Sequence, residues 1–598
     1  MDTKRKAIKN NLNNIYTKGG EILEKKNLYF GKDFLKLDNA AKVFPAQNTK
    51  QWSNVIRYSI NLTIDIDPVI LEKALKDILP RFPSMCVKIR RGVFWYYFEH
   101  NDKIPVIIED DLKHQCVPVK YDESNDFLFK IFYCKNRITI EAFHALTDGY
   151  GCEIFLNTLA AQYLRLKGHK ISTGGSVFDI TEKPKTEELE DSFLKNATKG
   201  AKASRSKPNI YHKKGEKLPA FCSHVTVGYM PLDKIKELCK KYNATITEFF
   251  TAVLVEIYID FQKKEAKKQK EISIQVPVNA RNQFDSKTLR NFSLCYSVRF
   301  DPTLGDYTFE EIIKQTSLYL RYINNKKTLG AMFASNIKLE SLPIMRIIPL
   351  VIKDLAIGIS YALTAECTTT ALLTNLGKVD LPEDMIEFVE SSILMPPPGL
   401  LNGGRIGLSS VKNTFTVAIA NCYEDTDIER AFFTKIKDFD IPLKLETNFN
   451  EKNTETLLEP IPEKDVNLKK KDRHWAITSS LSILGFSILS VILNILLTPV
   501  TPWSAYVVFA TGILWNLSVL PFIARKFLTK FHSIMAVLSS ITTFSLLLQI
   551  VMYFIPHSLI FDYLVITTAV VSFMLFATSF VATKNRKLKK WLSKKFYF

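Results

Sequence analysis

The stretch RITIEAFHALTDGYGCEIFLNTLAAQYL, residues 137–164, decides the fold expected for this chain. Its first seven residues are rich in β-branched and aromatic side chains, which predicts a strand. After Gly149 the apolar residues follow helical spacing, which predicts a helix. Between the two lies the pattern H-x-x-x-D-G, formed by His144, Asp148 and Gly149. A histidine at a strand end, before a turn that glycine permits, presents its imidazole to a cleft, where it can act as a general base.

Three further stretches extend this pattern. Residues 58–100 predict a strand, a helix and a β-hairpin, residues 271–300 predict two strands flanking an irregular loop, and residues 368–385 predict a strand that runs into a turn. Residues 244–262 predict an amphipathic helix. In this order the elements of residues 30–445 resemble the chloramphenicol-acetyltransferase-like superfamily, which includes the condensation domains of nonribosomal peptide synthetases. Within that group the chain is most similar to the bacterial alcohol-acetyltransferase-like proteins.

The resemblance implies an α/β fold built from two-layer α+β halves that form a pseudo-dimer. The first half would span residues 30–190 and the second residues 215–445, with residues 191–214 as a basic linker. The sheets of the two halves would pack around a central tunnel. Acyl donor and acceptor would enter this tunnel from opposite faces.

The resemblance also implies a chemistry, the transfer of an acyl group, such as acetyl, from a thioester to a hydroxyl or amine. His144 would be the base that deprotonates the acceptor, although a hydrogen-bonded histidine at a domain seam is the alternative. Asp148 would be structural and pair with Arg281, which could instead simply cap a strand end, and Gly149 would have a backbone role. Many members carry two consecutive histidines here, whereas this chain has Phe143 at the first position.

Weaker candidates surround this motif. Asn279 and Asn291 bracket a loop that resembles the channel-lining loop of the superfamily, and Thr374, Asn375 and Gly377 match its S-N-x-G turn. A hydroxyl or amide at these positions could donate to an oxyanion, but ordinary turn chemistry explains Asn-x-Gly equally well. We expect no metal and no bound cofactor. A coenzyme A thioester is the expected co-substrate.

Composition restricts the remaining possibilities. A chain of 598 residues predicts two or three domains. Its nine cysteines are scattered without a C-x-x-C pair, which argues against a zinc ribbon or disulfide scaffold and favours a reducing compartment. The net charge of +19 does not indicate nucleic acid, because two of the three basic clusters adjoin apolar segments. The basic segment 1–29 lacks an apolar core and is not a signal peptide.

After a linker, residues 446–474, the composition becomes that of a membrane domain, residues 475–598. Four apolar segments are long enough to span a bilayer, and the only charged residue in them is Asp562. The segments are residues 475–497, 503–523, 533–555 and 559–581. By the positive-inside rule both termini and the large N-terminal region are cytoplasmic. Residues 343–363 predict a buried or membrane-grazing helix, with a fifth span as the alternative.

The leading hypothesis is therefore an integral membrane acyltransferase of the cell membrane, with acyl-CoA as donor and a hydroxyl or amine acceptor that could be lipid-like. A carrier-protein donor is a close variant, as in condensation domains. Phe143 motivates a second hypothesis, a non-catalytic binding protein on the same fold. A sensor or transporter accessory centred on the membrane domain is the third.

Overall fold

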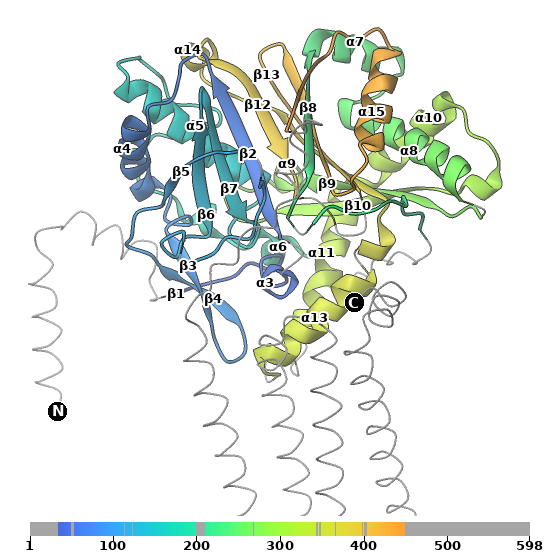
Figure 1. Ribbon diagram of the computed structural model, residues 1–598. Helices are drawn as coiled ribbons and strands as arrows, with labels where there is room; N and C mark the ends of the chain where they lie inside the picture. The colour runs from blue at the N-terminus through green and yellow to red at the C-terminus, as the bar shows by residue number, and fades with distance from the viewer. Residues whose placement is uncertain are drawn as a thin grey trace, which may run out of the picture. The chain divides into compact units, whose positions relative to one another are not determined.

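The computed structural model describes residues 34–448 of the chain, which belong to the unit that spans residues 1–461 (Figure 1). The gaps in this description are residues 49–52, 113, 122, 199–209, 220, 267, 342–344, 346–347, 365, 398 and 400–402. The predicted segment 1–29, the linker beyond Asn448 and the predicted membrane domain all lie outside the described residues. In the described part of the chain, every helix is too short or too polar to cross a bilayer.

A five-stranded sheet carries the motif and has the order β12-β2-β7-β6-β5. Its strands are β2 (Val55–Leu62), β5 (Ile107–Glu109), β6 (Phe129–Cys134), β7 (Arg137–Phe143) and β12 (Val389–Met395). Helices α4 (Pro68–Ile78) and α5 (Gly149–Leu166) cover one face. The hairpin that follows α4 consists of β3 (Val87–Arg91) and β4 (Tyr96–His100). These elements confirm the predicted strand, helix and hairpin of residues 58–100 and the predicted strand and helix around the motif.

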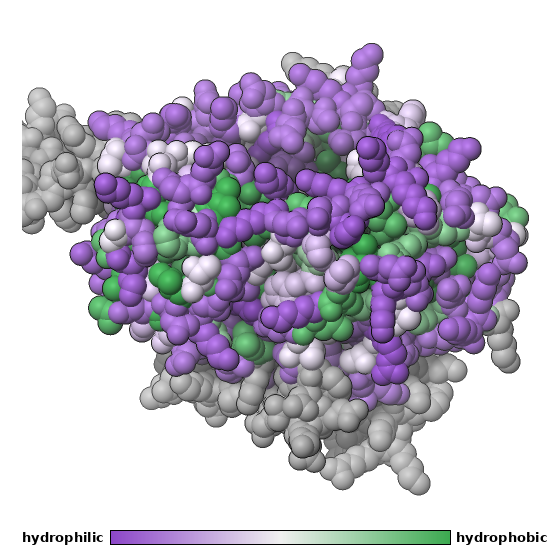
Figure 2. All heavy atoms as spheres, turned by 90° about the horizontal axis from the view of Figure 1, so that it is seen from above, coloured by the Kyte–Doolittle hydropathy of each residue, from purple (hydrophilic) through white to green (hydrophobic). Residues whose placement is uncertain are grey.

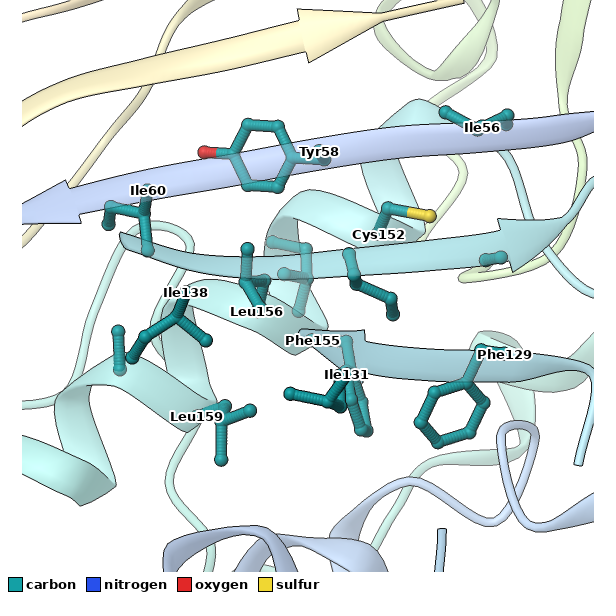
Figure 3. Close-up of a cluster of buried hydrophobic side chains, with 14 of the residues drawn as sticks. Ile56, Tyr58, Ile60, Phe129, Ile131, Ile138, Cys152, Phe155, Leu156 and Leu159 are labelled. Carbon is teal, nitrogen blue, oxygen red and sulfur yellow. The ribbon is translucent and has the colours of Figure 1, made fainter. Parts of the chain in front are cut away.

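The core of this part lies between α5 and the sheet (Figure 3). Alternate residues of the strands, such as Tyr58 of β2 and Ile138 of β7, point toward the helix. Phe155 and Leu156 of α5 point back toward the strands, and both are fully buried. Because α5 is fixed along much of its length by this packing, its first residues are held at a defined place beside the end of β7.

A seven-stranded sheet has the order β10-β9-β11-β13-β14-β8-β15. Its strands are β8 (His224–Pro231), β9 (Ile272–Asn279), β10 (Ser293–Phe300), β11 (Ala371–Lys378), β13 (Gly404–Val411), β14 (Thr414–Asn421) and β15 (Lys444–Thr447). Strands β9 and β10 pair antiparallel around a loop that holds the short helix α9 (Arg281–Phe284), and β11 ends in a turn. These elements confirm the predictions for residues 271–300 and 368–385.

The helix predicted from residues 244–262 is present as α8 (Ile246–Glu265), but the prediction that it is amphipathic was wrong. Its residues are buried almost all round, because α8 lies against the sheet and is itself packed against other helices. Those neighbours include α7 (Leu232–Lys241), α10 (Phe309–Ile323) and α15 (Asp427–Lys437). A helix that is apolar on most sides is typical of a buried position.

The two expected halves do not keep separate sheets. Strand β12 comes late in the sequence, yet it pairs antiparallel with β2 and covers an edge that would otherwise be open. It also packs on the seven-stranded sheet, where the Ser409 hydroxyl donates to the Ser392 carbonyl at 2.7 Å. A Cβ at Gly407 would lie 1.9 Å from the Leu394 carbonyl oxygen, so this crossing requires glycine. The described fold is thus a mixed α/β structure whose two large sheets are joined by β12.

Smaller elements complete the unit. A three-stranded sheet has the order β1-β4-β3, with β1 at Phe34–Lys36. The remaining helices are α3 (Phe44–Gln47), α6 (Ser192–Asn196), α11 (Lys326–Ser341), α13 (Leu350–Thr364) and α14 (Glu383–Ile386). Seen from above, the molecule presents mostly hydrophilic side chains with smaller apolar patches between them (Figure 2).

Candidate active site

The turn that carries His144 is held at both ends. The His144 backbone N–H donates to the Asn54 carbonyl at 2.7 Å, which continues the pairing of β2 and β7 by one residue. At the other end Asp148 is the N-cap of α5, and its carboxylate accepts from the Gly151 N–H at 3.3 Å. His144 is half-buried, whereas Phe143, which replaces the first histidine of the superfamily pattern, is 2% exposed.

Asp148 and Arg281 form a buried, bidentate ion pair. The Arg281 guanidinium donates to the two carboxylate oxygens at 2.8 and 3.1 Å, and both side chains are almost fully buried. The Phe292 backbone N–H also donates to Asp148, at 2.9 Å. Since Arg281 and Phe292 both belong to the β9–β10 region, the motif turn is fixed directly to the seven-stranded sheet.

Gly149 and Gly151 differ in what a side chain would meet. A Cβ at Gly149 would make only ordinary contacts, the nearest being the Leu376 side chain at 3.6 Å. A Cβ at Gly151 would lie 2.0 Å from the Thr147 hydroxyl and 2.4 Å from the Leu289 carbonyl oxygen. The close approach of α5 to the neighbouring loop therefore depends on Gly151. This glycine was not among the predicted site residues.

Asn291 contacts the catalytic candidate directly. Its Oδ1 lies 2.9 Å from Nδ1 of His144, and its Nδ2 donates to the Asp38 carboxylate at 3.3 Å. A carboxylate accepts hydrogen bonds, so it directs the amide NH₂ of Asn291 toward itself and the amide oxygen toward His144. The proton of the neutral imidazole then sits on Nδ1, and Nε2 keeps its lone pair. This orientation is the one that a general base needs.

Asp38 is itself firmly placed. It is fully buried, accepts from the Ala41 N–H at 2.7 Å and lies 3.6 Å from the Arg290 guanidinium. The Arg290 side chain also donates to the Lys36 carbonyl at 2.7 Å. The polar chain Asp38–Asn291–His144 is therefore anchored at its far end by contacts between the N-terminal segment and the β9–β10 region.

Phe44 covers one side of the imidazole. Its ring stacks on His144 with centroids 4.5 Å apart and planes inclined by 20°. Burial lowers the pKa of His144 below its ordinary value of 6.5, although Asp148, Asn291 and Asp38 each act in the opposite direction. A lowered pKa keeps the imidazole neutral, and so able to accept a proton, at pH 7.

Asn279 and Asn375 have hydrogen-bond partners other than His144. Asn279 is exposed and accepts from both the backbone N–H and the guanidinium of Arg281 at 3.1 Å, so it supports the ion pair. The Asn375 amide donates to Thr247 at 2.9 Å, and its Oδ1 accepts from the Gly377 N–H at 2.8 Å. Gly377 has a φ of +91°, as an Asn-x-Gly turn requires.

The turn that contains Thr374 nevertheless lies near the motif. Leu376, between Asn375 and Gly377, would be the nearest contact of a Cβ at Gly149. Thr374 is half-buried on β11 and pairs with Gly407 of β13. The segment therefore borders the start of α5, while both polar groups of the Asn375 side chain are used in hydrogen bonds to Thr247 and Gly377.

A small cavity of about 50 Å³ lies between the five-stranded sheet and strands β8 and β15. Its lining includes the charged residues Arg57, Arg137 and Glu446, and the predicted site residues are not among its lining residues. Arg57 is paired with Glu141 at 2.7 Å, and Arg137 is paired with Glu446 at 2.8 Å. The cavity therefore has both polar and apolar walls, and its two arginines are already paired with carboxylates, which leaves no uncompensated positive charge for an anionic ligand.

Sequence reasoning missed Asp38, Phe44 and Gly151. Asp38 and Phe44 lie about 100 residues or more before their partners, in a segment without a recognisable motif. Only Gly151 had a local signal, as the second glycine of the D-G-x-G run.

No protein-family model matches this chain, and no curated protein resembles it in sequence. Several solved structures are similar to it. The TRI101 protein of F. graminearum, solved with coenzyme A and T-2 mycotoxin, has 11% identity and a TM-score of 0.46 over 69% of this chain and 99% of its own. The starter condensation domain of rhizomide synthetase RzmA, solved with C8-CoA and Leu-SNAC, has 12% identity and a TM-score of 0.43 over 68% and 93%.

The condensation domain of the monacolin K polyketide synthase MokA has 14% identity and a TM-score of 0.44 over 68% of this chain and 97% of its own. The structural neighbours of this chain therefore include condensation domains and TRI101. These likenesses are distant, and none of the three reaches a TM-score of 0.5.

Proposed function

We propose that this chain is an acyltransferase in which Nε2 of His144 is the general base. The observation that carries the proposal is the hydrogen bond between Nδ1 of His144 and Asn291, whose amide is oriented by Asp38. It leaves the Nε2 lone pair available on a half-buried imidazole with a lowered pKa. The Asp148–Arg281 pair supports the same reading, since it holds the turn on which the base sits.

The reaction needs few groups. The acceptor oxygen or nitrogen attacks the carbonyl carbon of the thioester while Nε2 of His144 takes its proton. The C–S bond of the resulting tetrahedral species then breaks, the thiolate leaves, and the imidazolium returns the proton to sulfur. No covalent enzyme intermediate is required. Thr374 stays our candidate for oxyanion stabilisation, because the Asn375 amide is already engaged within its turn.

Acyl-CoA is the donor that we propose, and a carrier-bound thioester is the variant to test beside it. We further propose that the four apolar segments between residues 475 and 581 anchor the protein in the cell membrane, with the described unit on the cytoplasmic side. An enzyme anchored in a membrane is close to amphiphilic acceptors such as lipids or long alcohols, so we propose acceptors of this kind.

The test is thiol release by the full-length protein in detergent or lipid nanodiscs. Acetyl-CoA, longer acyl-CoAs and acylated carrier protein would each be offered with a panel of alcohols and amines. Release that depends on the acceptor and disappears in His144→Ala is the expected result. Binding of the thioester without release, for every donor and acceptor, would instead favour a non-catalytic binding protein, which the buried Phe143 also suggests.

A further inference from the structure

Helix α13 covers much of residues 343–363, the apolar stretch interrupted by charged residues for which we predicted a buried or membrane-grazing helix. Lys353 is buried, its ammonium donates to the Phe94 carbonyl at 2.8 Å, and it lies 3.5 Å from the Trp95 ring centroid. Asp354 accepts from the Tyr96 hydroxyl at 2.8 Å. The Lys353 and Asp354 side chains therefore contact the β3–β4 hairpin and join the helix to it.

The opposite face of α13 is apolar and open to solvent. Ile352 is 38% exposed and Leu355 is 61% exposed, and they are three residues apart, on one side of the helix. The tip of the hairpin lies beside them, because the Leu350 N–H donates to the Val93 carbonyl at 2.8 Å. Val93 is 72% exposed and Phe94 41%.

We call Val93, Phe94, Ile352 and Leu355 the apolar rim. The end of the hairpin and helix α13 lie at the same edge of the unit in Figure 1. Trp95 and Tyr96 follow Phe94 in the hairpin, and the Lys353 ammonium lies 3.5 Å from the Trp95 ring centroid. Apolar side chains next to aromatic and basic ones form the pattern of membrane-interface anchors.

We propose that the apolar rim docks into the headgroup region of the bilayer that holds this protein. The inference rests on the proposed membrane anchoring. Twenty-six residues, 449–474, separate Asn448, the last described residue, from the first proposed span, and this length reaches at most about 90 Å when fully extended. The unit therefore stays close to a lipid surface, and an exposed apolar rim has that surface as its nearest partner.

Docking at this rim would also orient the site. Helix α13 packs against α3, and a Cβ at Gly358 of α13 would lie 3.6 Å from the Ala46 carbonyl oxygen of α3. Phe44, in the same short helix, stacks on His144. The rim and the base are thus connected through α13 and α3, which favours a substrate that reaches the base from the bilayer, such as an amphiphilic acceptor.

The test is photo-crosslinking of the full-length protein in vesicles that contain an alkyne-tagged phospholipid. A benzophenone amino acid would replace Val93 or Leu355, and in the controls it would replace Val69 or Leu318, which are 76% and 62% exposed on other helices. We expect lipid labelling at the rim positions roughly tenfold above the controls. Equal labelling at all four positions, or rim adducts with a second copy of the chain or another protein, would overturn the proposal.

A second measurement uses activity. We expect Leu355→Asp to slow acylation of a bilayer-embedded acceptor and to leave a short soluble acceptor unaffected, while Leu318→Asp changes neither. Two controls separate the underlying proposals. Retention of the protein in membranes after an alkaline carbonate wash tests the anchoring. Thiol release with the soluble acceptor tests the chemistry. If both controls give the expected result but the rim positions are not labelled by lipid, the docking proposal is refuted, whereas the proposed anchoring and acyl transfer are not.

Discussion

At the scale of single residues, the proposed chemistry depends on how the imidazole of His144 is held. Asn291 fixes its tautomer, Asp38 fixes the amide of Asn291, and Phe44 covers one side of the ring. None of these three needs to touch a substrate. They act by keeping the lone pair of Nε2 in one direction, so they are positioning residues.

Substitution of Asn291 tests this role. Asn291→Leu has a similar volume but cannot accept from Nδ1 of His144, so both tautomers and several ring orientations become accessible. We expect kcat to fall by roughly tenfold to a hundredfold. The dissociation constant for acyl-CoA, measured by calorimetry, should stay the same. A variant that loses donor binding in proportion to activity would assign Asn291 to the binding of substrate instead.

The pH dependence of the reaction follows from the direction of the His144 pKa shift. A base is active when it is neutral, which is above its pKa, and burial lowers this pKa below 6.5. The acid limb of kcat/KM should therefore have its midpoint below pH 6.5. A profile measured with a soluble acceptor checks this, and a midpoint above pH 7 would contradict it.

The sequence predicted part of this arrangement. His144 and Asp148 could be proposed because the H-x-x-x-D-G motif contains them, and the pairing of Asp148 with Arg281 could be proposed because the resemblance to the superfamily implies it. Asp38 and Phe44 could not, since the contacts that give them a role join segments far apart in the chain. Asn291 was expected at a channel wall, whereas the structure places it against the imidazole.

At the scale of elements, the junction of β7 and α5 is fastened to the loop between β9 and β10. Periodicity predicted these strands and helices well, because alternation and helical spacing are local properties. The pairing of β12 with β2 was not predictable, since a strand pattern tells which face is buried and not which strand lies beside it.

The two glycines of the junction should respond differently to alanine. Gly151→Ala places a Cβ against Thr147 and the backbone of Leu289, and we expect a loss of about 1–3 kcal/mol in the free energy of unfolding. Gly149→Ala meets only ordinary contacts and should change it by less than about 0.5 kcal/mol. Thermal unfolding of the two variants measures the difference, and equal midpoints would refute it.

The buried ion pair gives a second test of the junction. Arg281→Met leaves the Asp148 carboxylate buried without its cation, and a loss of about 3–5 kcal/mol in stability is expected. Arg281→Lys should not restore the lost stability, because one ammonium cannot reproduce the two parallel hydrogen bonds that the guanidinium donates to Asp148. As a control, Lys234→Met removes an exposed pair with Glu237 and should have no measurable effect. If Arg281→Met has the same free energy of unfolding as the wild-type protein, the ion pair does not hold the turn.

At the scale of the whole molecule, residues from both large sheets meet around one histidine, and β12 joins those sheets. The proposed membrane domain would locate this chemistry at a bilayer. The four proposed spans, with basic residues in the loops of one side, would place both termini on that side.

This topology can be checked with epitope tags on the two termini. In inside-out membrane vesicles we expect both tags to be digested by added protease, and in right-side-out vesicles we expect both to be protected. Tags with opposite accessibility would mean an odd number of spans.

We propose that this protein transfers acyl groups with His144 as the base. The most direct measurement is mass spectrometry of the acceptor after incubation with acyl-CoA and the full-length protein, with binding of the same acyl-CoA measured alongside. We expect an acylated acceptor with the wild-type protein and a rate loss of roughly a hundredfold or more in His144→Ala, while binding is retained. Equal product formation by both proteins, or donor binding without product from either, would contradict the claim.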